Sequence, residues 1–395
     1  MDIKTLVAAA AIVLGLPGLV GAAHLGLLVL ASWFYREPFY REPRSTEERE
    51  VRFLVLVPAH NEERVIRSTV EAILEQLRPR DQLLVVADRC TDATAEIARS
   101  LGASVLERGP DEPPGRAAAR QAGLEHAREL EWDAVLMVDA DSIMGPGFLT
   151  ACERAMASGA AAVQARGDSG RGRSLAQEAA LAAFTLHGLT IPRGRDRLGV
   201  GVRLRGTGMA IRRDVAMAHR FSAPASEDLF FTLDLLVEGI RCRHVDAARV
   251  RFQGASGWDE FGGQKVRYEA GRIGAARTYL PRLLRRAVRE RDLSCLEFAW
   301  FLASPPFAVG VLSLLLATAL AAVAGAWTVA TVFGAGLAVL AITIATGLIQ
   351  ARAGLRTWLA LFAAPWYLAW KAIVHLRAIA SVLRRDEYYA PTARA

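Results

Sequence analysis

The sequence predicts an α/β protein whose sheet is parallel and doubly wound, with membrane-spanning helices on either side of it. Two observations carry this prediction. Short apolar strands alternate with helical patterns from residue 53 to residue 138, which is typical of a parallel sheet covered by helices on both faces. The charges are unevenly distributed, because residues 5–35 and 298–351 contain no Asp, Glu, Lys or Arg. The water-soluble part should therefore lie between two apolar ends.

The composition excludes several classes of protein. The chain has 395 residues, enough for two or three domains, and 48 basic against 41 acidic residues give a net charge of +7. Its apolar share of 52% exceeds the roughly 45–50% of an average soluble protein. The four cysteines are scattered without a C-x-x-C pair, which excludes a disulfide scaffold or a cysteine zinc site and indicates a reducing compartment.

The N-terminal region predicts an uncleaved membrane anchor. The apolar run 6–34 is longer than the roughly 20 residues that cross a bilayer, and too long for the core of a signal peptide. Arg36, Arg41 and Arg44 follow it, against Lys4 alone before it. The apolar run therefore predicts an integral membrane protein. The positive-inside bias places its middle part in the cytoplasm. The alanine-rich and arginine-rich composition suggests the inner membrane of a bacterium.

The C-terminal region predicts two further spans, at 298–323 and 327–349. Pro305 and Pro306 lie inside the first span and are expected to be kinks, which lipid tolerates. A third apolar segment, 358–374, is followed by arginines that a crossing helix would carry to the wrong side. An interfacial or re-entrant helix is therefore favoured for this segment, and a third C-terminal span stays open.

The middle of the chain should form four strands, at 53–57, 83–86, 104–106 and 134–138, separated by helices at 62–77, 92–101 and 115–130. Ligands of such sheets bind beyond the carboxyl ends of the strands. Polar groups gather at these ends, since the first strand is followed by Pro58, His60, Asn61 and Glu62, and the second by Asp88. One edge of the sheet is therefore the expected ligand-binding edge.

Asp139 and Asp141 follow the fourth strand with one residue between them. This spacing allows both carboxylates to lie on one side of the chain and to hold a divalent cation, which would neutralise the charge of a leaving diphosphate. The alternative is a solvated turn, because the D-x-D pattern is common.

Asp88 and Asp92 follow the second strand. Asp92 is best explained as a helix N-cap, whereas the position of Asp88 at the sheet edge favours a hydrogen bond to the imide N–H of a uracil. The sequence contains neither G-x-G-x-x-G after the first strand nor G-x-x-x-x-G-K-[ST]. These absences count against Rossmann dehydrogenases and P-loop enzymes.

Ser226, Glu227 and Asp228 precede a run with helical spacing at 229–240. They cap this helix, or one carboxylate acts as a base that takes a proton from an acceptor hydroxyl. The helix dipole should lower the pKa of such a carboxylate, while nearby charges act in different directions.

Residues 264–268 should be helical, so that Gln264, Arg267 and Tyr268 share one face. Arg267 would then grip a phosphate and Tyr268 would stack on a sugar, or the face is merely solvated and basic. Further arginines continue this charge, at positions 272, 277, 282, 285, 286, 289 and 291. They indicate a basic amphipathic stretch on anionic membrane lipids and not a nucleic-acid site, because membrane spans flank it.

In order along the chain, segments 57–63, 85–92, 139–141, 226–228 and 264–268 read VPAHNEE, VVADRCTD, DAD, SED and QKVRY. This series resembles the D, DxD, TED and QxxRW motifs of membrane-embedded family 2 glycosyltransferases. That group includes cellulose, chitin-oligosaccharide, poly-N-acetylglucosamine and hyaluronan synthases and ceramide glucosyltransferases. The resemblance implies a GT-A fold, in which a doubly wound mixed sheet forms a Rossmann-like domain for a nucleotide sugar.

The resemblance also implies the chemistry, namely an inverting transfer from a UDP-sugar, with glucose or N-acetylglucosamine, to an acceptor hydroxyl. Asp228 would deprotonate this hydroxyl, and Asp139 and Asp141 would bind Mg²⁺ or Mn²⁺. Matching positions assign the donor to Pro58, His60, Asn61, Glu62, Asp88, Arg116, Asp139 and Arg267. They assign the acceptor or product to Gly206, Thr207, Glu227, Gln264 and Tyr268.

Three positions depart from the motifs of the family. Ser226 replaces the usual threonine and keeps its hydroxyl, and Arg116 stands where many members have a lysine. Tyr268 replaces a tryptophan, which shrinks the platform under an acceptor sugar and makes long-chain synthesis less certain.

The favoured function is synthesis of a cell-surface polysaccharide or oligosaccharide. One alternative is transfer of a single sugar to a membrane lipid, and a second is a non-catalytic nucleotide-sugar-binding scaffold. The partners are then the UDP-sugar, a glycan or lipid acceptor, anionic lipids and, in an oligomer, a second copy of the chain. The expected division is an anchor at 1–35, a glycosyltransferase domain at 36–262, basic interfacial helices at 263–296, two spans at 297–350 and a membrane-associated region at 351–395.

Overall fold

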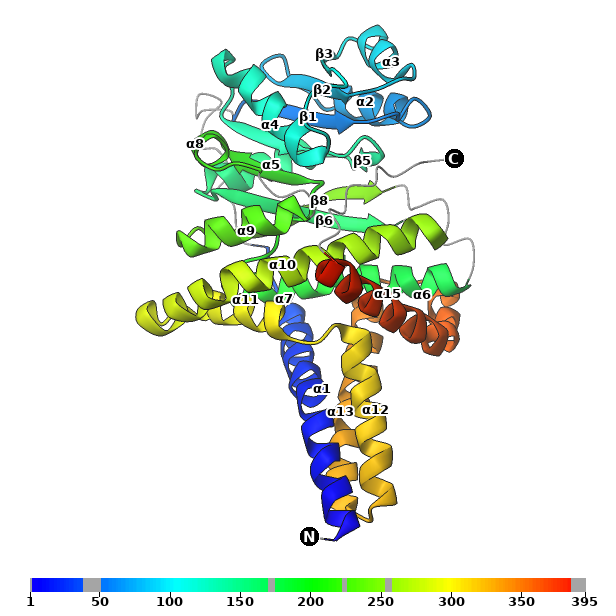
Figure 1. Cartoon of the computed structure of the whole chain (residues 1–395). Coiled ribbons are helices and arrows are strands. Elements are labelled where there is room, and N and C mark those ends of the chain that lie inside the picture. The colour runs from blue at the N-terminus through cyan, green and yellow to red at the C-terminus, as the bar shows by residue number, and fades with distance from the viewer. Residues whose placement is uncertain (1, 38–50, 170–174, 222–225, 253–257, 385–395) are drawn as a thin grey trace.

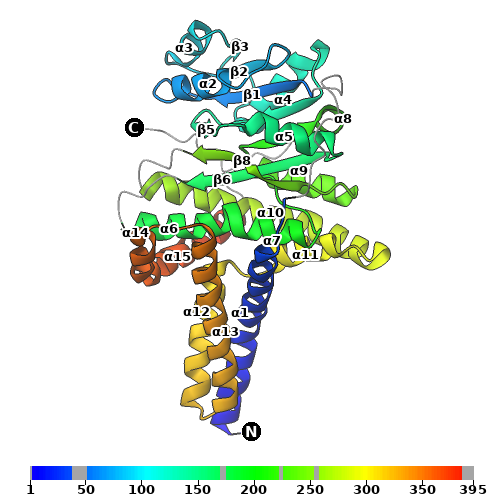
Figure 2. The ribbon, with the colours of Figure 1, turned by 180° about the vertical axis from the view of Figure 1, so that it is seen from behind.

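A computed structural model describes residues 2–37, 51–169, 175–221, 226–252 and 258–384. Three layers follow one another in Figure 1: the sheet with its covering helices, a belt of helices across the middle, and a stalk. The stalk consists of α1 (Ile3–Trp33), α12 (Phe307–Val323) and α13 (Trp327–Gln350). Figure 2 shows the same order of layers from behind.

The described strands form one eight-stranded sheet with the order β3-β2-β1-β4-β7-β6-β8-β5. Its strands are β1 (Phe53–Ala59), β2 (Gln82–Asp88), β3 (Ser104–Arg108), β4 (Ala134–Met137), β5 (Ser142–Met144), β6 (Ala162–Ser169), β7 (Met209–Arg212) and β8 (Arg243–Phe252). The four expected strands, β1 to β4, pair in parallel, whereas β7 is antiparallel to both β4 and β6. The sheet is therefore mixed, as the GT-A resemblance implies.

Helices cover both faces of the sheet. They are α2 (Ile66–Leu74), α3 (Thr94–Ser100) and α5 (Phe148–Ala157) on one face, and α4 (Arg116–His126), α8 (Arg213–Ala218) and α9 (Glu227–Val237) on the other. An apolar core lies on each face of the sheet. Successive side chains of β1 pack alternately into these two cores, because side chains of a strand alternate between faces. Val55 and Val57 lie in the first core and Leu54 and Leu56 in the second, all fully buried.

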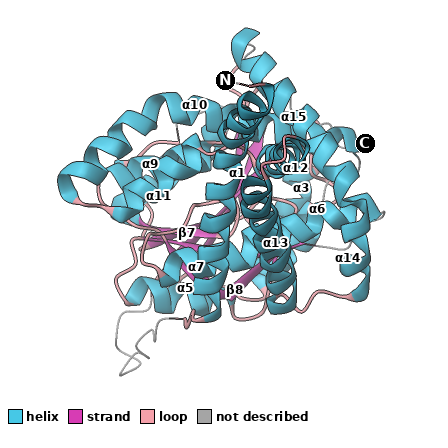
Figure 3. Ribbon diagram, turned by 90° about the horizontal axis from the view of Figure 1, so that it is seen from below, coloured by secondary structure: helices cyan, strands magenta, loops and turns pink. Residues whose placement is uncertain are grey.

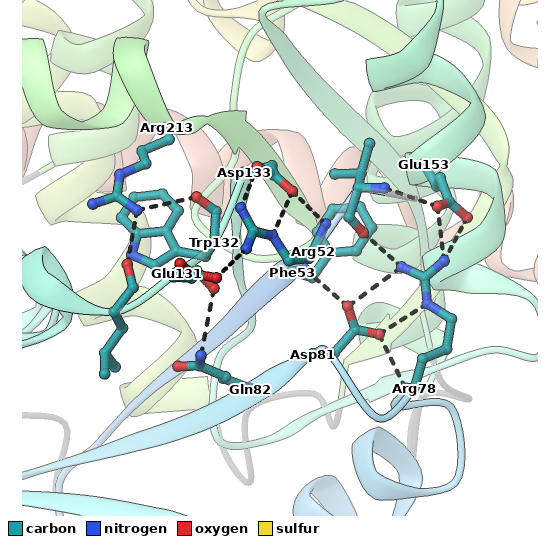
Figure 4. Close-up of polar contacts among 12 residues, drawn as sticks. Arg52, Phe53, Arg78, Asp81, Gln82, Glu131, Trp132, Asp133, Glu153 and Arg213 are labelled. Carbon is teal, nitrogen blue, oxygen red and sulfur yellow. Dashed lines mark hydrogen bonds and ion pairs between the residues drawn. The ribbon is translucent and has the colours of Figure 1, made fainter. Parts of the chain in front are cut away.

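The amino ends of the strands are closed by charged side chains (Figure 4). The guanidinium of Arg52 donates to Asp133, and that of Arg78 donates to both Asp81 and Glu153. Asp81 also accepts from the backbone N–H of Phe53, at the start of β1. The charged groups at this edge are paired with one another. The carboxyl edge of the strands is therefore the edge expected to bind a ligand.

The belt is built from long helices that lie across the top of the stalk (Figure 3). Its elements are α6 (Leu175–Thr185), a π-helical turn (Leu186–Thr190), α7 (Ile191–Arg197), α10 (Trp258–Glu290), α11 (Leu293–Ala303), α14 (Leu355–Leu359), a 3-10 turn (Ala360–Ala363) and α15 (Ala364–Arg384). The helix α10 runs as one element through the boundary expected between residues 262 and 263.

Buried polar contacts join the belt to the stalk. The carboxylate of Glu297 on α11 forms an ion pair with the Arg195 guanidinium on α7 at 2.6 Å, and lies 3.3 Å from Nε2 of His24 on α1. The hydroxyl of Ser32, near the end of α1, hydrogen-bonds the side chain of Gln350 at the end of α13. These side-chain contacts therefore tie together α1, α7, α11 and α13.

Small residues bring the stalk helices close together. A Cβ at Gly18 of α1 would lie 2.6 Å from the carbonyl oxygen of Gly310 on α12. Among the described residues, α1, α13 and the segment Leu355–Arg384 are long and apolar enough to cross a membrane, and α11 with α12 pass the same test only as a bent pair. In Figure 1, however, α15 lies across the stalk and not along it.

The span expected at 298–323 is not one straight helix, because α11 and α12 meet at a bend of 71°. Ser304 is extended, with φ −66° and ψ 145°, and Pro305 and Pro306 follow it. Proline lacks the N–H that continues a helix and disfavours helical geometry in the residue before it. Two successive prolines therefore end α11, and α12 starts only at Phe307.

Candidate functional site

The loops after β1 and β2 are locked together at the carboxyl edge of the sheet. Nδ1 of His60 lies 2.6 Å from the carbonyl oxygen of Asp88. The side-chain oxygen of Asn61 accepts from the backbone N–H of Thr91 at 2.8 Å. The backbone N–H of Glu62 donates to the hydroxyl of Thr94. Sequence analysis assigned His60, Asn61 and Glu62 to the donor, and the structure brings their segment beside Asp88.

Asp88, the last residue of β2, is 4% exposed and both of its carboxylate oxygens have partners in the chain. One accepts from the Arg108 guanidinium at 2.5 Å, and the other accepts from the backbone N–H of Gly115 at 3.2 Å. Asp88 thus fixes the segment that leads into α4 and its first residue, Arg116. Its hydrogen bond to a nucleobase stays a prediction.

Asp92 lies two residues before α3 and accepts from the backbone N–H of Thr94, the first residue of that helix, at 3.0 Å. It also accepts from the N–H of Glu63. It therefore satisfies one free backbone donor at the start of α3, but Ala93 and not Asp92 holds the N-cap position.

The centre of the site is a buried guanidinium that sequence analysis missed. Arg120 on α4 has no exposed surface. Its Nη1 donates to Glu227 at 2.7 Å, while its Nη2 donates to Asp139 at 3.1 Å and to the carbonyl oxygen of Gly206 at 2.7 Å. One side chain therefore joins the D-x-D segment, the 206–208 loop and the start of α9. The only signal in the sequence is its place four residues after Arg116, on the same helical face.

Asp139 lies just beyond β4 and faces cations from α4. Its second carboxylate oxygen lies 3.4 Å from the Arg116 guanidinium, and its backbone N–H donates to the hydroxyl of Thr207. Asp141 is two residues away, and its carboxylate accepts from the Ser142 hydroxyl at 3.4 Å. The structure therefore brings Asp139 and Arg116, both expected at the donor, together with Thr207, which was expected at the acceptor.

Asp139 and Asp141 alone supply only part of the ligands that a divalent cation needs. Among the described residues, no group of three or more His, Cys, Asp or Glu side chains is arranged to hold a metal ion. Mg²⁺ is commonly held by one or two protein carboxylates together with substrate phosphates and waters. The donor set of Asp139 and Asp141 therefore suits a cation that arrives with a diphosphate.

The loop at 206–208 lies between the D-x-D segment and Asp228. Gly206 has φ +81°, a backbone conformation that favours glycine, and a Cβ there would lie 3.7 Å from Oδ2 of Asp228. Thr207 is 4% exposed, and its carbonyl oxygen accepts from the side chain of Gln164. The chain thus supports this loop from behind while its glycine lies against the carboxylate.

Asp228 is in the first turn of α9. Ser226 holds the N-cap position in a left-handed conformation, with no hydrogen bond from its side chain to the helix, so it does not cap the helix through its hydroxyl. Burial, followed by the neighbouring Glu227 carboxylate, raises the pKa of Asp228 above its ordinary value, although Arg203 and Arg120 oppose this. The expected lowering by the helix dipole is therefore outweighed, and the carboxyl group is a better base than its position suggests.

The helix α10 carries Gln264, Arg267 and Tyr268, each partly buried. The hydroxyl of Tyr268 accepts from the guanidinium of Arg203, which also lies 5.0 Å from the tyrosine ring centroid. Arg203 is close enough to Asp228 to favour its charged form. Tyr268 is thus linked to the catalytic candidate through an arginine that the sequence analysis had not identified.

The arginines expected to form a basic amphipathic stretch on membrane lipids, on α10 and just after it, divide into two groups. Arg272 is buried, and its guanidinium donates to Glu269 and to the carbonyl oxygens of Phe301 and Ser304, at the break between α11 and α12. Arg286 donates to the carbonyl oxygen of Val237. The exposed group consists of Arg277, Arg282, Arg285, Arg289 and Arg291. The basic face is therefore real, but narrower than predicted.

Comparison with known proteins places this site in a described family. Residues 51–270, more than half of the chain, match the sequence profile of "Glycosyltransferase like family 2". A probable glycosyltransferase of Bacillus subtilis, YdaM, is 33% identical over 96 residues, which are 22% of either protein. The 4,4'-diaponeurosporenoate glycosyltransferase of Staphylococcus aureus is 36% identical over 90 residues, which are 22% of this chain and 23% of the relative. Each match thus spans less than a quarter of the relative.

Solved structures show the same fold. The mannosyltransferase PcManGT of Pyrobaculum calidifontis, solved with GDP-Man and Mn²⁺, has a TM-score of 0.53 at 18% identity, over 96% of this chain and all of that chain. Glucosyl-3-phosphoglycerate synthase of Mycobacterium tuberculosis, solved with Mn²⁺, UDP and phosphoglyceric acid, has a TM-score of 0.43 at 23% identity, over 57% of this chain and 80% of that chain. The likeness to PcManGT confirms the GT-A fold expected from the motif series.

Proposed function

The chain belongs to glycosyltransferase-like family 2, and on that premise we propose that it transfers a sugar from a UDP-sugar to an acceptor hydroxyl at a membrane, with inversion at the anomeric carbon. Glucose and N-acetylglucosamine are the proposed sugars. The observation that carries the proposal is the position of Arg120, which holds the D-x-D carboxylate and the start of α9 within one hydrogen-bonded unit.

On the donor side, Asp139 and Asp141 would hold Mg²⁺ or Mn²⁺ together with the diphosphate of the nucleotide. The cation would supply charge neutralisation for the departing UDP. The guanidinium of Arg116 lies 3.4 Å from Asp139, so its positive charge would lie beside the same diphosphate. Arg267 on α10 is the second proposed contact to the diphosphate.

On the acceptor side, Asp228 takes the proton of the attacking hydroxyl. A general base works best when its pKa lies near the working pH, so a raised pKa improves this step. Attack opposite the departing diphosphate gives a β-glycosidic bond from an α-linked donor. Glu227 does not touch the reacting atoms in this scheme, because Arg120 binds it. It is a positioning residue.

The packing of the stalk favours transfer of one sugar over polymer synthesis. The described stalk helices touch through glycines, as Gly18 and Gly310 do, and Gly15 lies against Phe333 in the same way. Such contacts bring α1, α12 and α13 directly against one another at these levels. Transfer to a lipid needs no passage, whereas polysaccharide synthesis would require a channel shared between copies of the chain.

The exposed arginines of α10 support a membrane position for the belt. Arg282, Arg285 and Arg289 lie exposed on the last third of this helix, beside the level at which the stalk begins. Basic side chains at such a level attract anionic lipid head groups. We therefore place the belt at the cytoplasmic surface of the membrane, with the sheet above it.

The first test is Asp228→Asn in the full chain, purified in lipid nanodiscs. Sugar transfer should fall by about a hundred-fold to ten-thousand-fold, because an amide cannot take the proton, while binding of UDP with Mn²⁺ persists. UDP release, with mass spectrometry of the product, measures both the rate and the acceptor. Asp214→Asn is the matched control, since Asp214 is exposed and pairs only with Arg212 among the described ion pairs.

Each outcome of this test decides between functions. Equal loss of UDP binding in Asp228→Asn would show that the residue serves the donor. A ladder of additions would support the polysaccharide synthase, and a single addition to a lipid would support the glycolipid enzyme. UDP binding by the wild type without turnover across a panel of UDP-sugars would leave only the scaffold.

A further inference from the structure

A group of basic side chains lies on the acceptor side of Asp228. This basic cluster consists of three residues. Arg203 and Arg205 lie on the segment before Gly206, and Lys265 lies on α10. A Cβ at Gly206 would be 3.7 Å from Oδ2 of Asp228. The cluster therefore begins one residue away from the point at which the backbone touches the proposed base.

Neither arginine of the cluster forms an ion pair within the described parts of the chain. Arg203 donates to the Tyr268 hydroxyl, and Arg205 donates to the carbonyl oxygen of His187 at 3.0 Å. The nearest buried carboxylate on α10, Glu269, is taken by Lys371 at 3.1 Å and by Arg272 at 3.2 Å. Among the described carboxylates, Asp228 and the already paired Glu269 favour the charged form of Arg203, and Asp228 favours that of Arg205, in each case without an ion pair.

Aromatic rings, and not carboxylates, lie beside the two guanidinium groups. Arg203 lies 5.0 Å from the ring centroid of Tyr268 and 5.3 Å from that of Phe301, and Arg205 lies 4.8 Å from that of Phe184. Such rings add cation–π attraction, which is weaker than the pairing of a charge with an anion. The surroundings hold the guanidinium groups in place without neutralising them.

Like charges in the cluster also oppose one another. Burial, and then the nearby Arg203, lowers the pKa of Arg205 to about 10. Burial, and then Lys371 and Arg205, lowers the pKa of Lys265 to about 7. A bound anion would relieve both effects, because an opposite charge stabilises the protonated form.

The cluster lies where a lipid would enter. Phe301 is on α11, just before the bend that leads into α12 of the stalk, and Lys371 is on α15. The donor carboxylates instead lie with Arg116 and Arg120 of α4. An acceptor rising from the membrane would thus meet aromatic rings and basic groups before it meets Asp228.

We propose that the basic cluster binds an acidic group, a phosphate or a carboxylate, carried by a lipid acceptor whose hydroxyl is presented to Asp228. This inference rests on the proposed function and narrows its acceptor to anionic amphiphiles. Arg203 and Arg205 make the contact, because two guanidinium groups offer several N–H donors to the oxygens of one anion. The neighbouring rings cover the first part of the apolar chain.

Isothermal titration in nanodiscs of neutral phosphatidylcholine tests this inference, with empty nanodiscs as the blank. The probes are octyl phosphate, octanoate, octanol and inorganic phosphate. Octyl phosphate and octanoate should bind at least about tenfold more tightly than octanol, as expected for hydrogen bonds to a charged group. Arg205→Gln should weaken binding of both anions about tenfold or more, while Arg205→Lys retains most of it.

Arg285→Gln is the matched control, because Arg285 is an exposed arginine near the far end of α10. Equal weakening by this variant would show a general charge effect and overturn the proposal. Octanol binding as tightly as octyl phosphate would overturn anion recognition, and inorganic phosphate binding equally well would overturn a lipid acceptor. If Arg205→Gln lowers the melting temperature, the comparison of wild type with Arg205→Lys and the four probes still decides.

Titration of UDP with Mn²⁺ separates this inference from the proposed function. UDP binding without selective binding of octyl phosphate would overturn the inference alone, whereas absence of UDP binding would overturn the proposed function. Weakening of UDP binding in Arg205→Gln to the same extent as anion binding would assign the cluster to the donor.

Discussion

Arg120 is the side chain on which the geometry of the site depends most. It is fully buried, and its guanidinium binds Glu227, Asp139 and the Gly206 carbonyl oxygen. Removal of one partner from a buried ion pair typically costs about 3–5 kcal/mol, because the other charge stays buried without compensation. The site is therefore sensitive to a residue that is not expected to touch the substrate.

Arg120→Met should lower the stability of the protein by about 3–5 kcal/mol, since Glu227 would lose its buried partner. Thermal unfolding in the same lipid nanodiscs measures this loss. Arg120→Lys keeps the charge but offers a single ammonium group, so UDP and Mn²⁺ binding should be weakened even where the fold survives. An unchanged melting temperature for Arg120→Met would contradict the assigned role.

The raised pKa of Asp228 predicts the pH dependence of the reaction. A base is active when deprotonated, so the rate falls as the pH drops through its pKa. Because that pKa is raised, the acid limb of the kcat/KM profile should lie above the ordinary aspartate value of about 4. Glu227→Gln removes one cause of the shift, so the limb should move to lower pH. A limb that stays in place would show that Glu227 does not act on Asp228.

At the scale of elements, the packing of α7 against α1 leaves no room for a side chain at Gly194. A Cβ there would overlap the carbonyl oxygen of Leu28. Gly194→Ala should therefore destabilise the protein by about 1–3 kcal/mol, as overpacking does, and the loss is measured as a lower melting temperature. Gly334→Ala on α13 is the control, because a Cβ there meets nothing within 4 Å. Equal effects of the two variants would contradict a specific contact between α1 and α7.

The elements that the sequence predicted best are those with a strong local pattern. Residues 53–57 and 134–138 alternate between two apolar cores, and their strands form as expected. The helix expected at 62–77 covers only Ile66–Leu74, because the residues before it are held by hydrogen bonds to the loop after β2. Such bonds come from residues far apart in the sequence, so periodicity does not reveal them.

The residues of the site also divide into those that a local pattern predicts and those that depend on the tertiary fold. Asp88 and Asp139 were predictable, because each follows an apolar strand and parallel strands end at a common edge. Arg120, Arg203 and Arg205 were not, since a buried arginine looks like a solvated one until its acceptors are known. Their partners lie on α9, in the 206–208 loop and on α10. Only the tertiary fold brings these segments to one place.

At the scale of the whole molecule, the proposed membrane position of the belt makes the orientation of α15 testable. This helix lies across the stalk, and its large apolar side chains at Trp366, Ile373 and Leu376 are exposed. Such a face fits the membrane surface, in the way of an interfacial helix. Its partner contact, Lys371 with Glu269 of α10, lies on the side away from this face.

An interfacial α15 predicts that both ends of the segment Leu355–Arg384 face the same side of the membrane. In a background without the native cysteines, Ala353→Cys and Arg384→Cys should both react with an impermeant maleimide from the cytoplasmic side. Ala326→Cys, between α12 and α13, should react only from the opposite side and serves as the control. Labelling of positions 353 and 384 from opposite sides would show that the segment crosses the bilayer.

The three bonds of Arg120 have a thermodynamic consequence for the order of events. Asp139 is shared between this guanidinium and the proposed cation, so a donor that draws Asp139 away changes how firmly Gly206 and Glu227 are held. Binding at the donor side of the site would then change the acceptor side. By linkage, the factor by which UDP alters acceptor affinity must equal the factor by which the acceptor alters UDP affinity. On the proposed function, the buried arginine would thus couple the binding of donor and acceptor.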